Sequence, residues 1–262
     1  MRRLVVNADD FGFTRDVNRG ILEAHLRGIL TSTTLMANGS AFDDAVRLAR
    51  DTPTLDVGVH GVLVQGPGQP RDVQALIQAL ILRRFQPYEE LKRQVDRILA
   101  AGIQPTHFDT HKHTHLLPPV LEAVARLCQE YRIPWVRRPV DLPLTTAPAE
   151  VPLSTRLISR AMSGVRGRFH RILTRRGLKT TDHFAGFQLT GRFRATHLVA
   201  LIRALPDGFT EFMCHPGYCT DELRAARTRL KESREHELAA LLDPTVRAAL
   251  AESQVHLSPY VR

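Results

Sequence analysis

One short stretch of this sequence carries an imidazole or a carboxylate at every second position. Successive side chains of an extended strand point to opposite faces. A strand here would therefore present the first four of these groups on one face, and the fifth as well if the strand continues that far. A row of ionisable groups is expensive to bury unless something pairs with it. Imidazoles and carboxylates are also ligands of divalent transition metals, so the stretch predicts a strand end that contributes to a metal site. The residues are His107, Asp109, His111, His113 and His115.

Three other strand-like segments end in the same kinds of side chain. Asp9 and Asp10 end the first segment, His60 ends another, and His215 follows the segment 209–214. Active sites of α/β folds gather at the carboxyl ends of the parallel strands. Each residue alone could be a capping aspartate or a core histidine, but their joint placement indicates one shared site.

The two adjacent aspartates are expected to have different roles. They would point to opposite faces of an extended strand, and a turn at Phe11-Gly12 could bring both to one site. One carboxylate could then bind the metal, while the other accepts a proton from a water. Capping of the following helix is a role that Thr14 can already fill.

Two imidazoles and one carboxylate leave coordination positions open for water and substrate, which is typical of a catalytic metal site. His60, His111 and one aspartate would supply this set. A metal lowers the pKa of bound water to about 7 and polarises a carbonyl oxygen. His215 could then protonate a leaving amine. These parts suit the hydrolysis of an amide or ester.

The elements that must hold these residues alternate between strand and helix along most of the chain. Alternation favours a mainly parallel α/β sheet, open or closed into a barrel, and an α/β barrel can run to about 250 residues as one domain. We therefore expect one domain over 1–262, with a basic irregular excursion around 140–181 where the alternation lapses. The expected strands are 4–8, 31–37, 55–60, 106–110, 134–137, 209–214 and 255–257, and the helices are 16–28, 41–50, 88–101, 118–131 and 234–242.

The net charge of +9 raises the question of an anionic partner. Only four of the 36 basic residues are lysine, which indicates a general use of arginine rather than a binding surface. The run from Arg156 to Arg176 lacks the interleaved aromatic residues of a single-strand binder, so we favour a solvated helical excursion over nucleic-acid binding.

Other features of the composition indicate a cytoplasmic protein. No segment approaches the about 18 consecutive apolar residues of a membrane span. The first ten residues meet two acids before any secretory apolar core forms, so they are expected to be a strand. Three cysteines, Cys128, Cys214 and Cys219, are odd in number and irregularly spaced. They match no common zinc spacing and no disulfide framework, so they are expected to be packing residues in a reducing compartment.

Several blocks of the sequence resemble the signature blocks of the YdjC-like carbohydrate deacetylases, a family that includes chitooligosaccharide deacetylases. They run in family order over nearly the whole chain, and residues 181–186 (Thr-Asp-His-Phe-Ala-Gly) are similar to a further element. After His60 this chain has Leu63-Val64 and a short Gly/Pro turn, where the family usually shows Leu-Thr and a longer insertion. The blocks are 7–12 (Asn-Ala-Asp-Asp-Phe-Gly), 31–38, 58–60, 105–115 and 213–217.

The resemblance implies a distorted or incomplete (β/α) barrel that uses one divalent metal to remove an acetyl group from an N-acetylated sugar, such as a chitooligosaccharide. It also makes a homodimer plausible. The metal is often magnesium in the family, whereas two imidazole ligands favour zinc or another transition ion. Carried over by position, Asp10, His60 and His111 would hold the metal, Asp9 would be the general base and His215 the general acid. The groups that orient ligands or face the substrate would be His107, Asp109, His113 and His115.

Two alternative functions stay open at the level of sequence. A metal-dependent phosphoesterase on the same barrel would bind two metals about 3.5–4 Å apart, and the additional His113 and His115 leave room for that. A non-catalytic binder of anionic polymers would use the stretch from Arg156 to Arg176.

Overall fold

A curled parallel sheet forms the centre of the molecule. The computed structural model describes residues 1–66, 68–142 and 151–260. Neighbouring strands pair in the order β5-β4-β3-β2-β1-β7-β6, and β8 pairs with the start of β1. All the pairings are parallel. The strands are β1 (Arg2–Phe11), β2 (Ser32–Leu35), β3 (Asp56–Gly61), β4 (His107–Thr110), β5 (Trp135–Val136), β6 (His183–Ala185), β7 (Gly208–Cys214) and β8 (Val255–Leu257).

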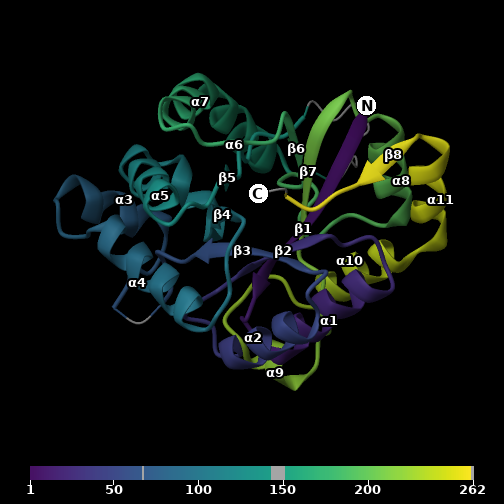
Figure 1. Cartoon of the computed structure of the whole chain (residues 1–262), viewed down its shortest axis with the longest axis horizontal. Helices are drawn as coiled ribbons and strands as arrows, with labels where there is room; N and C mark the ends of the chain where they lie inside the picture. Colours follow the sequence, from purple (N-terminus) through teal and green to yellow (C-terminus); the bar gives the residue numbers. More distant parts are fainter. Residues whose placement is uncertain (67, 143–150, 261–262) are drawn as a thin grey trace.

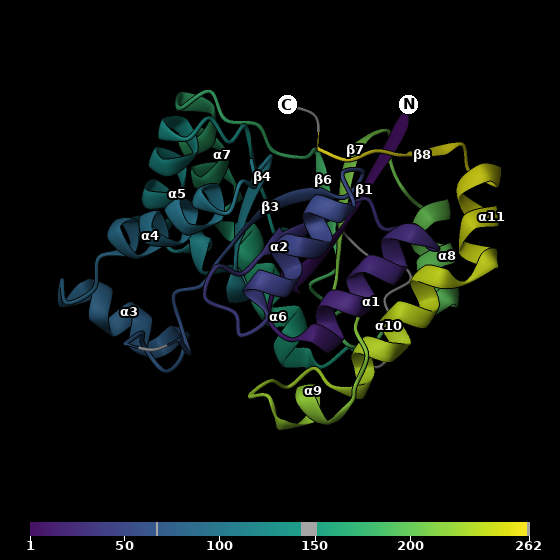
Figure 2. The ribbon, with the colours of Figure 1, turned by 60° about the horizontal axis from the view of Figure 1, so that its bottom comes forward.

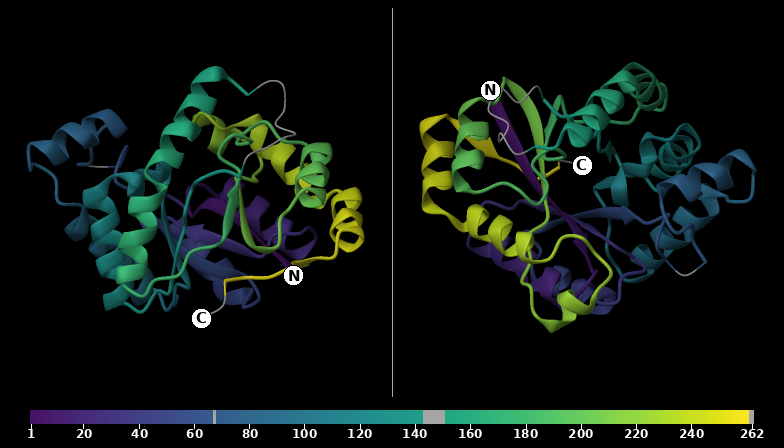
Figure 3. Two further views of the ribbon diagram at one scale, coloured as in Figure 1. Left: turned by 90° about the horizontal axis from the view of Figure 1, so that it is seen from above. Right: turned by 180° about the vertical axis from the view of Figure 1, so that it is seen from behind.

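Helices cover the outside of the sheet, with α3, α4, α5 and α7 on one side of the molecule and α8, α10 and α11 on the other (Figures 1 and 3). The central strand β1 is buried from Leu4 to Phe11, and its apolar residues Leu4, Val5, Val6, Ala8 and Phe11 are interrupted by polar ones. The helices are α1 (Arg15–Leu26), α2 (Phe42–Asp51), α3 (Val73–Ile81), α4 (Pro87–Ala100), α5 (Pro118–Glu130), α6 (Leu153–Gly164), α7 (Arg166–Arg175), α8 (Ala195–Arg203), α9 (Asp221–Ala225), α10 (Glu232–Leu242) and α11 (Pro244–Glu252), with a 3-10 segment η1 (His111–Leu116).

The sheet curls without closing into a regular barrel. Between β5 and β6 the described residues are joined by isolated bridges, one from Trp135 to Lys179 and one from Asp141 to Phe184. The predicted fold class, a distorted or incomplete (β/α) barrel with parallel strands, is confirmed. We retain the single domain as a proposal, since one hydrophobic cluster contains residues from helices on both sides of the sheet.

Most of the expected elements are present, and the differences lie where the sequence pattern is weak. The structure adds β6 and the helices α3, α6, α7, α8, α9 and α11. The excursion expected to be irregular contains the two helices α6 and α7, while its part at 143–150 lies outside the described residues. Thr14 caps α1 as predicted, because its side chain accepts a hydrogen bond from the Val17 amide.

The three cysteines are buried and free, as expected. None of the helices in the described part of the chain has the length and apolar character of a bilayer-spanning segment. One end of the barrel carries both termini, and α9 lies at the opposite end (Figure 2). Because β1 begins at the terminal end, its carboxyl end points toward α9, and this is the end where the candidate site lies.

A candidate metal centre at the carboxyl ends of the strands

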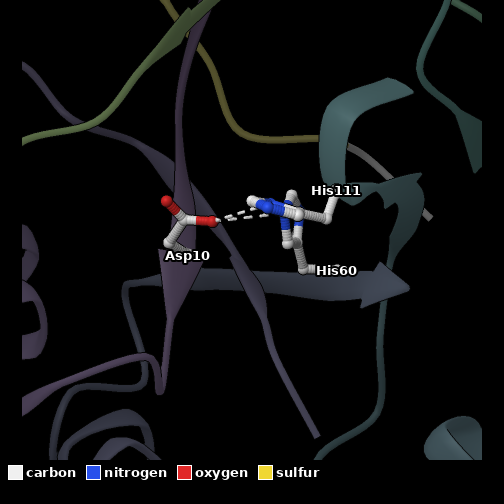
Figure 4. Close-up of side chains that lie close together, drawn as sticks. All are labelled: Asp10, His60 and His111. Atoms are coloured by element: carbon white, nitrogen blue, oxygen red, sulfur yellow. Dashed lines mark hydrogen bonds and ion pairs between the residues drawn. The ribbon is translucent and has the colours of Figure 1, made fainter. Parts of the chain in front are cut away.

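Three side chains from distant parts of the chain meet at this end of the sheet. Asp10 is on β1, His60 is on β3, and His111 is the first residue of η1 (Figure 4). Asp10 Oδ1 lies 3.4 Å from His60 Nε2 and 3.4 Å from His111 Nδ1. The two imidazole nitrogens are also 3.4 Å apart. The structure therefore brings together the three residues that the sequence predicts as metal ligands.

The chemistry and spacing of this triangle fit a divalent metal ion. Asp10 Oδ1 is buried and accepts no hydrogen bond from the described residues. Three such donor atoms within 3.4 Å of one another lie close enough for one divalent ion to bind all of them.

Local backbone geometry turns both aspartates toward the site. The expected turn at Phe11-Gly12 is present, because the Phe13 amide donates to the Asp10 carbonyl at 3.0 Å and Gly12 has a φ of 92°. Asp10 itself has a φ of 70°, and the pairing of β1 with β2 shifts register between Ala8 and Phe11. A bulge of this kind re-aims side chains at a strand end, which explains how two adjacent carboxylates serve one site.

Asp109 orients His60 from behind the triangle. His60 Nδ1 lies 2.5 Å from Asp109 Oδ1, and Thr34 Oγ1 donates to Asp109 Oδ2 at 3.1 Å. This contact directs the Nε2 lone pair of His60 toward the triangle, as carboxylates commonly do for metal-bound histidines. Burial lowers the pKa of His60, but Asp109 and the two aspartates of β1 outweigh burial and raise it to about 10. An ion and a proton would therefore compete for this imidazole.

Asp9 is held away from the triangle by a buried arginine. Arg137 Nη2 donates to Asp9 Oδ1 at 2.6 Å and Nη1 donates to Oδ2 at 2.8 Å, a two-bond pairing that fixes the carboxylate plane. Burial alone would raise the pKa of Asp9, but Arg137 outweighs it and holds the pKa well below its usual range. Asp9 is therefore ionised at neutral pH.

Arg137 joins three carboxylates below the site. Besides Asp9, it donates to Asp109 Oδ2 at 2.7 Å and to Glu211 Oε1 at 2.6 Å. Burial raises the pKa of Glu211 to about 7, although Arg137 opposes this shift. Asp9, the expected general base, and Asp109 are thus fixed by one guanidinium.

His215 lies on the other side of Asp9, directly after β7. Its Nε2 is 3.9 Å from Asp9 Oδ2, and its backbone amide donates to Glu237 Oε2 at 2.6 Å. Burial lowers the pKa of His215 to about 4, and Asp9 and Asp10 oppose this only in part. The imidazole is therefore neutral at rest and lies beside the proposed base.

The expectation that all five alternating residues share one strand face is wrong beyond Thr110. The strand ends there, and Lys112 and His113 have left-handed φ values of 55° and 52°. His113 packs instead against aromatic rings, 5.7 Å from Phe187. His115 is buried and lies 3.0 Å from the backbone carbonyl of Arg137 through Nε2. His113 and His115 therefore pack against neighbouring residues and do not continue the row of candidate ligands.

His107 lies at the start of β4, deeper in the barrel than the triangle. Its Nε2 is 2.8 Å from Asn7 Oδ1, and its ring stacks on Tyr260 at 4.1 Å. Asn7 in turn donates to Asp9 Oδ1 at 3.2 Å. Among the described residues, Asn7 thus links His107 to Asp9.

Reasoning from sequence missed the charged residues that hold the two aspartates. Arg137 follows β5, and the rule that strand ends carry functional groups could have found it, since it closes the predicted strand 134–137. Arg234 and Glu237 lie on α10, and Arg234 Nη2 donates to Asp10 Oδ2 at 2.5 Å. Both fall inside an ordinary predicted helix, so no sequence signal separates them from surface charges.

A second group of close carboxylate and imidazole atoms lies deeper, formed by Asp9, His60 and Asp109. It shares His60 with the triangle, and Arg137 donates to both of its carboxylates. The guanidinium therefore occupies the place that a second cation would need. This arrangement disfavours the two-metal phosphoesterase that the sequence left open.

Comparisons with known proteins show what the chain as a whole is similar to. A sequence model of the family described as YdjC-like protein matches residues 3–252. A carbohydrate deacetylase of Geobacillus stearothermophilus is 37% identical, over 99% of this chain and 97% of that protein. A carbohydrate deacetylase of Mus musculus is 33% identical, over 97% of this chain and 93% of that protein. The crystal structure of an Enterococcus faecalis protein, 25% identical, superposes with a TM-score of 0.74 and covers 99% of this chain and 97% of its own.

Proposed function

The chain belongs to the YdjC-like protein family, and we propose that it is a carbohydrate deacetylase that hydrolyses the amide of an N-acetylated sugar with the help of one divalent metal ion. The names of its full-length relatives support the reaction class. The observation that carries the proposal is the triangle of Asp10, His60 and His111, with the ionised carboxylate of Asp9 beside it. An N-acetylglucosaminyl compound such as a chitooligosaccharide is the proposed substrate.

The side chains around the triangle divide the work of amide hydrolysis. A divalent ion held by Asp10, His60 and His111 would lower the pKa of a water and polarise the acetyl carbonyl. Asp9, kept ionised by Arg137, accepts the proton that the attacking water loses. The carbon–nitrogen bond breaks and acetate leaves, while the neutral imidazole of His215 accepts the proton taken up by Asp9 and passes it to the amine nitrogen of the sugar. Its position 3.9 Å from Asp9 puts the acid beside the base.

The first test is release of acetate. Purified protein is incubated with diacetylchitobiose and related N-acetylglucosaminyl compounds, and free acetate is measured with and without a chelator. We expect acetate from at least one of them and none after chelation. Release of phosphate from sugar phosphates, with no acetate from any N-acetylated sugar, would refute the proposal.

Metal content gives a separate prediction. We expect one tightly bound ion per chain, because Arg137 fills the place of a second. We also expect zinc to restore the chelated protein at lower concentration than magnesium, since imidazole ligands favour a transition ion over magnesium. Elemental analysis and metal titration measure both quantities. Two tightly bound ions per chain would contradict the prediction and favour the phosphoesterase.

Replacement of a single imidazole tests the triangle itself. His111→Ala removes one of three protein ligands, so metal affinity should fall by more than the about 10–100-fold that loss of an outer partner brings. Acetate release should fall with it. The matched control is His256→Ala, which removes an exposed imidazole on β8 and should change neither quantity. Unchanged metal affinity in His111→Ala would remove this residue from the ligand set.

A further inference from the structure

The helical pair α6–α7 has a composition unlike the rest of the chain. Residues 151–181 contain seven arginines and one lysine and no aspartate or glutamate. The proposed deacetylase mechanism uses none of them. A segment of about thirty residues with only positive charges repels itself unless an anionic partner covers it.

The outward side of α6 carries large aliphatic side chains, which an ordinary surface helix keeps on its buried side. Leu153 is 70% exposed, Leu157 is 54% exposed and Ile158 is 52% exposed. Leu153 and Leu157 are four residues apart and so lie on the same face. The side that packs against the protein buries Ser159 and Met162. Three large aliphatic side chains therefore face solvent on a single helix.

Arginines run beside this apolar stripe. Arg156 and Arg160 are exposed on α6, also four residues apart, and form no ion pair with any described residue. On α7, Arg168, Arg171 and Arg175 are exposed as well. We call the exposed face of α6 formed by Leu153, Leu157, Ile158, Arg156 and Arg160 the basic apolar face.

The basic apolar face is anchored firmly to the barrel. Phe169 and Leu173 of α7 are buried, and the Phe169 ring lies 5.8 Å from the ring of His115. Gln188 Nε2 donates to Ser159 Oγ of α6 at 3.3 Å. Figure 2 shows α6 toward the end of the molecule that carries α9, away from the two termini. Leu157 and Ile158 thus belong to a helix that its neighbours hold in place.

Aliphatic side chains flanked by guanidinium groups match the surface of an anionic lipid bilayer. Apolar groups enter the boundary between headgroups and acyl chains, while arginines contact lipid phosphates. Nucleic acid fits less well, because the exposed residues include no aromatic ring for base stacking except the imidazole of His170. Pairing with a second copy would bring the arginines of two chains together. We propose that the basic apolar face docks this protein on anionic lipid surfaces.

The test is co-sedimentation of the full chain with vesicles, and it does not depend on the proposed deacetylase activity. We expect binding to vesicles of phosphatidylcholine with phosphatidylglycerol, weaker binding at raised salt, and none to phosphatidylcholine alone. The double variant Leu157→Ser/Ile158→Ser should lower the partition coefficient by about 10-fold or more. Arg156→Gln/Arg160→Gln should lower it by a similar factor.

A matched control comes from α3 and its C-terminal neighbour. Ile81 and Leu82 are 75% and 58% exposed, outside the basic apolar face. Ile81→Ser/Leu82→Ser should leave vesicle binding within about twofold of the parent. This result would distinguish docking through the basic apolar face from non-specific hydrophobic adsorption. Thermal melting of each variant verifies that the fold is intact.

Three results would overturn the proposal. The first is vesicle binding that Leu157→Ser/Ile158→Ser leaves unchanged. The second is binding to heparin or duplex RNA without binding to anionic vesicles, which would indicate a polyanion site. The third is a dimer of the parent protein, seen by light scattering, that Leu157→Ser/Ile158→Ser dissociates, together with no binding to vesicles. That result would indicate that a second copy of the chain covers the face.

Discussion

Asp9→Asn is expected to lower the turnover of acetate release by about 10²–10⁴-fold, the range that general acid–base catalysis contributes, and to leave one metal ion bound. The amide has the shape of the carboxylate but cannot accept the proton. Asp9 lies outside the triangle, and its two oxygens are taken by Arg137 in the resting site. The loss should therefore fall on turnover, with little change in metal affinity.

Asp109→Asn is the matched comparison, because Arg137 donates to this aspartate as well. Asp109 holds His60 at 2.5 Å and orients a ligand, so its amide variant should weaken metal binding by about 10–100-fold. Excess metal should then restore its turnover in part, and should not restore that of Asp9→Asn. Loss of the bound ion from Asp9→Asn would mean that the roles of Asp9 and Asp10 are exchanged.

The strand-end rule explains why sequence alone located most of this site. A parallel sheet brings the carboxyl ends of its strands to one edge, so Asp10 and His60 could be expected to meet without knowing the intervening loops. His111 was predicted for the wrong local reason. It lies just beyond the strand, and its ring reaches the triangle because β4 ends at Thr110.

The prediction from alternating residues is wrong after Thr110, because sequence periodicity does not show where an extended strand ends. The residues from His111 to His115 keep the spacing of a strand, yet left-handed backbone at Lys112 and His113 sends their side chains elsewhere. The helices α6 and α7 match the solvated helical excursion favoured for Arg156–Arg176, although the sequence did not predict their bounds. Large aliphatic residues exposed on α6 make its buried side hard to identify from the sequence.

Long-range charge pairs were the least predictable part of the site. Arg234 contacts Asp10, which lies 224 positions away in the sequence. The sequence around Arg234 predicts only an ordinary solvent-exposed helix. Burial, which separates such an arginine from a surface arginine, is a property of the assembled barrel. Arg137 differs, because it closes a predicted strand at the same edge as the other functional residues.

Arg137→Met is expected to destabilise the protein by about 3–5 kcal/mol, the usual result of removing one partner from a buried charge network. The side chain is completely buried, and its loss leaves Asp9, Asp109 and Glu211 without their shared cation. Urea unfolding measures the loss. Acetate release should fall as well, since the pKa of Asp9 would rise when its guanidinium partner is removed.

Arg137→Lys separates the charge from the geometry. An ammonium keeps the positive charge but cannot donate in the planar fork that reaches three carboxylates at once. We expect a stability between those of the parent and Arg137→Met, with turnover still reduced because the plane of Asp9 is no longer fixed. This variant also keeps the test decisive if Arg137→Met does not fold.

Glu211→Gln in the Arg137→Met background completes the test. Replacing one of the three carboxyl groups that share Arg137 should return part of the lost stability, so the two substitutions should be non-additive by about 0.5–3 kcal/mol. Turnover should not recover, because Asp9 still lacks its guanidinium partner. Strict additivity of the two stability changes, or full turnover in Arg137→Lys, would mean that Arg137 is a packing residue and that another group orients the base.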